Sequence, residues 1–191
     1  YINMEWKSTV MSIHKTNKPE LLIKFNETEN AKQLDEMIYQ FEKNINNKKE
    51  DYFLKESENP YIFFLEYPKP QELIKEIENE NIKTLETIVP VECVINNTNY
   101  ITSTILRKIR HKITYHDTFN ITCHVDSYIP HRKEKLEKEL KSKIQDILAI
   151  PIQKNNPIWN INIHIIGEVS AINIERSNKN RNKYSQYNNY C

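Results

Sequence analysis

The chain contains a single glycine, Gly167, among its 191 residues. Phosphate-binding loops need several glycines, because their turns require positive φ angles and a close approach of the backbone to the phosphate. The usual ATP- and NAD-binding folds are therefore excluded, and we expect no cofactor. The same shortage excludes the glycine-containing motifs with which two common RNA-binding folds hold their ligand.

The overall composition indicates a folded protein that contacts no membrane. Hydrophobic residues make up 38% of the chain, which suffices for a core at this length. No apolar run approaches the roughly 20 residues of a membrane span, and no signal peptide opens the sequence. Cys93, Cys123 and Cys191 are too few and too scattered for a disulfide framework or a zinc site. We therefore expect a cytoplasmic protein with reduced thiols.

The near-neutral net charge of +1 hides a strong asymmetry between the two halves. Residues 1–90 carry 12 lysines and no arginine against 17 acidic residues, whereas residues 91–191 carry 15 basic against 9 acidic residues. Arginine offers a planar fork for phosphate, and such asymmetry is a recognised sign of a polyanionic partner. The alternative explanation of the charge asymmetry is chance drift in a composition rich in lysine and asparagine.

The acidic half has the pattern of a small α+β unit. We expect strands over residues 6–13, 21–25, 61–65 and 82–88. Apolar residues three and four positions apart predict a helix over residues 31–45. A second helix follows Pro70, since proline suits a first turn. Two helices on one face of a four-stranded sheet predict a ferredoxin-like domain over residues 1–88.

The basic half predicts a second domain over residues 89–175 with the order β-α-β-α-β-β. Pro90 marks the expected break between the domains, and a separate strand is expected over residues 91–95. Isoleucine at every fourth position predicts a helix over residues 101–113, and another helix follows Pro130 up to Leu148. Residues 119–125 and 159–165 alternate apolar and polar side chains, as half-buried strands do. Gly167 fits a tight hairpin before the last strand. Residues 176–191 form a basic, tyrosine-rich tail that lacks apolar periodicity, so we expect disorder there.

The basic residues of the second half predict a phosphate-binding face. The stretch 96–115 contains no acidic residue, and unneutralised positive charge is what phosphate contact requires. A plain solvated helix face is the alternative, and the second helix is the weaker case because its acidic residues compensate much of its charge. The predicted RNA-binding residues are Arg107, Lys108, Arg110, Lys112, Arg132, Lys133 and Lys135.

No constellation of residues predicts catalysis or a metal site. Cys123 and His124 are adjacent in a strand and therefore point to opposite faces, and Cys123 shares the face of the core residues. His116, next to Asp117, lacks the spacing of a metal ligand, and so do His124 and His131. We expect no catalytic residue, no metal and no enzyme activity of this chain alone.

Four segments in sequence order make the second half similar to a THUMP domain, a tRNA-binding module. They are Ile88-Val89-Pro90-Val91-Glu92, Asp117-Thr118-Phe119-Asn120-Ile121, Asn156-Pro157-Ile158-Trp159-Asn160-Ile161, and residues 165–172 around Gly167. The resemblance implies an N-terminal ferredoxin-like unit followed by a THUMP α/β domain. It also implies binding of the tRNA acceptor stem and its single-stranded 3′ end.

The chain is similar to the stand-alone THUMP proteins of archaea and eukaryotes, which deliver tRNA to a separate cytidine acetyltransferase. That resemblance implies a non-catalytic tRNA-binding adaptor whose partners are tRNA and the modification enzyme. Two alternatives remain open. The chain is either a protein–protein scaffold with a THUMP-like fold, whose acidic half is the working surface, or a fragment of a longer RNA-modification enzyme.

Overall fold

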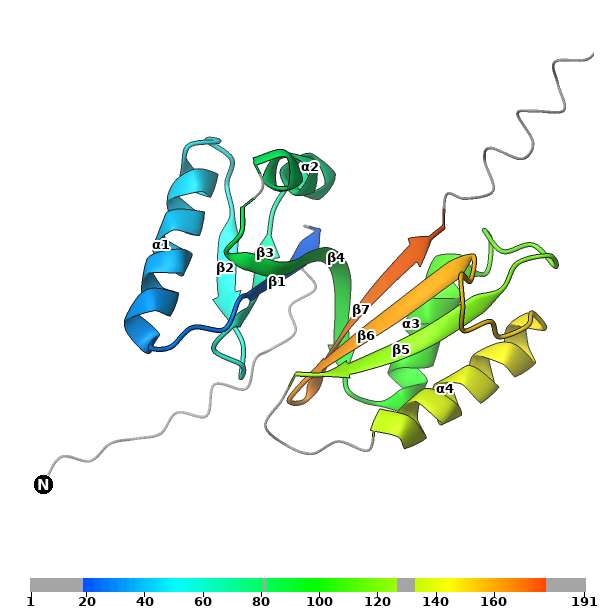
Figure 1. Ribbon diagram of the computed structural model, residues 1–191. Coiled ribbons are helices and arrows are strands. Elements are labelled where there is room, and N and C mark those ends of the chain that lie inside the picture. The colour runs from blue at the N-terminus through cyan, green and yellow to red at the C-terminus, as the bar shows by residue number, and fades with distance from the viewer. Residues whose placement is uncertain (1–18, 81, 127–132, 178–191) are drawn as a thin grey trace, which may run out of the picture.

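The computed structural model describes residues 19–80, 82–126 and 133–177, which form one seven-stranded sheet and four helices (Figure 1). The strand order is β2-β3-β1-β4-β7-β6-β5, and only β5 and β6 run parallel to each other. None of the four helices is both long and apolar enough to cross a membrane. The elements are β1 (Glu20–Phe25), α1 (Ala31–Asn46), β2 (Phe53–Glu56), β3 (Ile62–Glu66), α2 (Pro70–Glu80), β4 (Leu85–Ile95), α3 (Thr98–Ile109), β5 (Phe119–Val125), α4 (Lys133–Leu148), β6 (Trp159–Ile166) and β7 (Val169–Arg176).

The first half has the β-α-β-β-α-β order of ferredoxin-like folds, with α1 and α2 packed on one face of its strands. Phe25 of β1 lies at the centre of this core and meets Phe41 of α1 and Phe63 of β3 edge to face, at ring-centroid distances of 5.6 and 5.7 Å. The predicted strand over residues 6–13 lies outside the described residues. β2 was not predicted, because it is a short edge strand whose side chains are exposed or half-buried.

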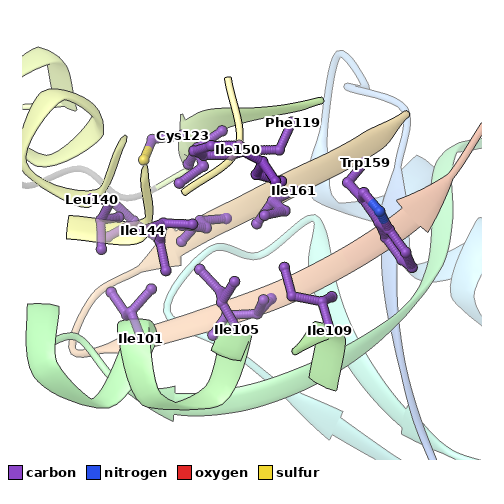
Figure 2. Packing of buried hydrophobic residues seen from close by; sticks show 14 residues of the cluster. Ile101, Ile105, Ile109, Phe119, Cys123, Leu140, Ile144, Ile150, Trp159 and Ile161 are labelled. Atoms are coloured by element: carbon purple, nitrogen blue, oxygen red, sulfur yellow. The ribbon is translucent and has the colours of Figure 1, made fainter. Parts of the chain in front are cut away.

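The second half has the predicted order β4-α3-β5-α4-β6-β7, and α3 and α4 cover the same face of its strands (Figures 1 and 2). The isoleucine repeat is confirmed, because Ile101, Ile105 and Ile109 are almost completely buried. α3 ends at Ile109, four residues before the predicted end. A helix that continued would need the backbone N–H of Thr114 for an intrahelical hydrogen bond. That N–H donates instead to the Asp117 carboxylate (3.1 Å).

The predicted hairpin around Gly167 joins β6 to β7. Gly167 has a φ of +59°, a value that L residues with a side chain rarely adopt. A Cβ at this position would also meet the carboxyl group of Glu58, which comes from the first half of the chain. Glu58 is exposed and its side chain can move aside, so the positive φ of the turn is the reason that favours glycine at this position.

β4 connects the two halves as one continuous strand, where separate strands on either side of Pro90 were expected (Figure 1). It pairs with β1 up to Val91 and with β7 from Glu92 onward. Pro90 therefore stands where β4 passes from one partner to the other, a position that tolerates a missing N–H better than a strand interior paired on both sides. The predicted boundary between residues 88 and 89 falls inside this strand. Each half has its own core, and a third cluster, which includes Leu22 and Ile166, joins them.

Candidate nucleic-acid interface

The predicted basic residues of the first helix occupy the last turn of α3 and the loop that follows it. Arg107 and Lys108 lie in the last turn, and Arg110 is the C-terminal cap residue. Lys112 lies in the turn after the helix. Arg110 and Lys112 are both exposed, and Arg110 Nε lies 3.0 Å from Nε2 of its neighbour His111.

Arg107 and Lys108 share one acidic partner, Glu92 of β4, which offsets one of their two positive charges. The Arg107 guanidinium contacts one carboxylate oxygen of Glu92, and Lys108 Nζ lies 3.2 Å from the other. The acid-free stretch 96–115 therefore gains an acidic partner from a neighbouring strand. In the part of the chain that the structure describes, Arg110 and Lys112 form no such ion pair.

The predicted residues of the second basic helix lie elsewhere. Lys133 and Lys135 are exposed in the first turn of α4, and Arg132 lies outside the described residues. Lys112 precedes the amino end of β5, whereas Lys133 follows its carboxyl end. The seven residues of β5 span about 20 Å. The structure therefore separates the two predicted groups along this strand rather than bringing them together.

A buried aspartate organises the turn between α3 and β5. Asp117 accepts hydrogen bonds from the backbone N–H and the hydroxyl of Thr114 (3.1 and 3.0 Å) and from Trp159 Nε1 (2.8 Å). Burial acts to raise the pKa of Asp117, but the hydrogen bonds from Trp159 and Thr114 and the nearby charge of Arg176 outweigh it, so the pKa lies below its usual value. An ionised, fully hydrogen-bonded carboxylate thus fixes this turn to β6.

The fixed turn presents aromatic rings to solvent beside the free cations. Tyr115 is 82% exposed, and the ring of His116 lies against it at a centroid distance of 3.8 Å. The Arg176 guanidinium, which is close enough to Asp117 to lower its pKa, lies over the ring of Trp159 at 5.5 Å. Arg176 is exposed and is the last residue of β7, although the predicted tail begins with it. We call this surface the basic end, and it consists of Arg110, His111, Lys112, Tyr115, His116 and Arg176.

The candidate catalytic pairs of the sequence diverge in space. Asp117 is turned into the fold while His116 is exposed. Cys123 is buried in the core, as predicted, and burial together with the nearby Glu137 carboxylate raises the pKa of its thiol to about 12. His124 is on the opposite face and stacks on His164 at 4.7 Å. Within residues 19–80, 82–126 and 133–177, no three histidine, cysteine or acidic side chains are arranged to hold a metal ion.

A second polar cluster ties the two halves of the molecule together at the end of β5. Oδ1 of Asp126 lies 3.2 Å from Nζ of Lys24 in β1, and its Oδ2 lies 3.4 Å from Nδ1 of His164 in β6. The Asp126 carbonyl also accepts a hydrogen bond from Asn59 Nδ2 (2.8 Å). We call these residues the Asp126 junction. Sequence reasoning missed it, because its members lie up to 140 positions apart and none belongs to a recognisable motif.

Comparison with known proteins identifies the fold. No family model matches the sequence, and no curated protein matches it either. Among solved structures, the chain is similar to PH1313 from Pyrococcus horikoshii, a THUMP-domain protein, with a TM-score of 0.66 and 12% identity over 83% of this chain and 54% of that one. It is also similar to a THUMP-containing 4-thiouridine synthetase solved in a complex with RNA and ATP, with a TM-score of 0.55 and 12% identity over 83% of this chain and 41% of that one.

These likenesses define an α+β protein with a THUMP-like fold, which confirms the predicted fold class. The chain spans about half the length of PH1313 and about two fifths of the synthetase.

Proposed function

We propose that this chain is a non-catalytic tRNA-binding adaptor that presents the acceptor stem and 3′ end of tRNA to a separate modification enzyme. Cytidine acetylation is the modification that we propose it serves. The observation that carries the proposal is the basic end, where Arg110 and Lys112 are exposed and have no acidic partner among the described residues, a few positions before the exposed ring of Tyr115. Cations of this kind bind phosphate, and an aromatic face beside them suits RNA.

Two further observations support the proposal. The THUMP-like fold is shared with a 4-thiouridine synthetase that was solved in complex with RNA. The divergent candidate pairs also favour a non-catalytic role, since His116 and Asp117 face different surroundings and the thiol of Cys123 is buried.

The first test is RNA binding as a function of salt. We expect the chain to bind intact tRNA more tightly than tRNA without its 3′ end, and more tightly than duplex DNA of equal charge. Three phosphate contacts, from Arg110, Lys112 and Arg176, give a slope of log affinity against log salt of about −2 to −3. An Arg110→Glu/Lys112→Glu variant should lose most of this affinity and flatten the slope by about 2. Binding that is weak, equal for all three nucleic acids and unchanged in this variant would contradict the proposal.

The matched control reverses two exposed lysines at the far end of β5. A Lys133→Glu/Lys135→Glu variant carries the same change in net charge, and both side chains are exposed. Unchanged tRNA binding places the interface at the basic end alone, whereas an equal loss extends it along α4 as the sequence predicted.

The adaptor role is tested with the enzyme. A purified tRNA cytidine acetyltransferase should modify its substrate faster when the wild-type chain is present, and the Arg110→Glu/Lys112→Glu variant should not accelerate it. A variant that still binds the enzyme but no longer binds RNA would separate the two contacts. Acceleration by this variant equal to that of the wild type would favour the protein–protein scaffold instead.

A further inference from the structure

Tyr115 combines an exposed ring with a fixed backbone, which is an unusual combination. Its exposed fraction, 82%, is the largest among the exposed large hydrophobic side chains of the described residues, where Phe53 follows with 60%. The ring therefore contributes almost nothing to the core. The turn that carries it is nonetheless held by the hydrogen bonds of Asp117 to Thr114 and Trp159.

The surroundings of Tyr115 suit a negatively charged, planar ligand. Its backbone lies three residues after Lys112 and five after Arg110, and neither cation has an acidic partner within the described part of the chain. His116 lies against the ring at 3.8 Å with an interplanar angle of 41°. Arg176, over Trp159, adds positive charge near Asp117.

We propose that Tyr115 stacks on an unpaired nucleobase while Arg110 and Lys112 hold the adjoining phosphates. The proposal rests on the proposed RNA-binding function and deepens it by naming the stacking residue. The bases of a duplex are paired and stacked on their neighbours, whereas the unpaired bases of a single strand can be splayed out and stacked on an aromatic ring. Stacking of a base on an aromatic side chain tolerates any sequence, because every base has a π face.

The test compares a short RNA duplex with blunt ends and the same duplex with a single-stranded 3′ extension carrying 2-aminopurine. Wild-type protein should prefer the extended duplex by about ten-fold, the scale expected of one stacked base. Its binding should also quench the 2-aminopurine fluorescence. Tyr115→Ala should remove both the preference and the quenching, whereas Tyr115→Phe, which keeps the ring, should retain both.

Tyr100→Ala is the matched control, because Tyr100 is also exposed (57%) but lies in the first turn of α3, at the other end of the helix. It should behave as the wild type. Tyr115→Ala protein that keeps the preference, or wild-type protein that shows none, would overturn the stacking role. If wild-type protein binds both duplexes equally and Arg110→Glu/Lys112→Glu weakens both, RNA binding stands and only the stacking role fails. If wild-type protein binds neither duplex, both proposals fail.

Discussion

Replacement of Asp126 by asparagine should destabilise the protein measurably, because this side chain joins the two halves of the molecule. The side chain of Asp126 is 14% exposed and lies 3.2 Å from Lys24 Nζ and 3.4 Å from His164 Nδ1. Hydrogen bonds to charged groups contribute a net 1.5–3 kcal/mol or so to the free energy of unfolding. Lys24 keeps Glu86 at 3.1 Å in the variant, so we expect the lower end, about 1.5 kcal/mol. For a chain of this size, this corresponds to a decrease in Tm of about 3–6 °C.

The effect of Asp126→Asn should depend on pH in a defined direction. The hydrogen bond with His164 and the pairing with Lys24 hold the pKa of Asp126 below its usual value, although burial opposes them. Such a carboxyl group stabilises the fold above its unfolded pKa, near 3.9, and this stabilisation is lost as the pH falls through the lower folded pKa. The difference in stability between wild type and variant should therefore be full at pH 7 and decrease as the pH falls below the unfolded pKa and through the lower folded pKa.

Thermal unfolding followed by circular dichroism at several pH values measures this difference. Asp146→Asn is the matched control, since Asp146 is an exposed aspartate of α4. Its Tm should change by less than about 1 °C, as expected for a surface substitution. If Asp126→Asn melted like this control at pH 7, or if its deficit did not decrease as the pH was lowered, the Asp126 junction would not hold the halves together as argued.

Two further predictions concern Glu92 and Cys123. Glu92→Gln releases Arg107 and Lys108 from their ion pairs. The affinity for tRNA should therefore rise, and the slope of log affinity against log salt should steepen by about 1 to 2. An unchanged slope would exclude the last turn of α3 from the interface. The raised pKa of Cys123, about 12, leaves almost no thiolate at pH 8. Iodoacetamide should therefore label this thiol orders of magnitude more slowly in native than in urea-unfolded protein. Mass spectrometry of the peptides measures the two labelling rates. Equal labelling rates in the two states would show that Cys123 is accessible.

Periodic segments could be predicted from the sequence, because local spacing fixes which face is buried. The four-residue isoleucine repeat of α3 and the alternation that buries Cys123 are confirmed. The hairpin at Gly167 is also confirmed, because glycine readily adopts the positive φ angle that this turn requires. These features depend only on neighbours along the chain, and the α+β fold class follows from their order.

Pairings between distant segments could not be predicted in this way. Pro90 suggested a break, yet β4 continues through it because its hydrogen-bonding partner changes at that point. Glu92 is two residues from Pro90 in the sequence, but its carboxylate reaches Arg107 on α3. The packing of α3 against β4 determines this contact, and no local pattern encodes that packing.

Long-range pairing also changes where phosphate contact is expected. Counting charges along the sequence favoured the exposed face of the α3 helix, but Glu92 offsets one of the two positive charges of Arg107 and Lys108 there. On α4, Lys141 and Lys143 pair with Glu137 and Glu139 one turn away. Within the described residues, the cations near α3 that have no acidic partner, Arg110 and Lys112, lie beyond the end of that helix, at the basic end.

The position of Arg110 and Lys112 has a second physical explanation, which the proposed experiments separate from RNA binding. Cations near the C-terminus of a helix interact favourably with its macrodipole, typically by 0.3–1 kcal/mol or so each. Charge reversal at these two positions therefore costs about 1–2 kcal/mol of stability, which is a small part of the 5–15 kcal/mol or so typical of a folded domain. The variant should remain folded, so a loss of RNA binding cannot be attributed to unfolding. The macrodipole also gives no reason for an exposed ring at Tyr115, whereas a ligand with a free base beside its phosphates does.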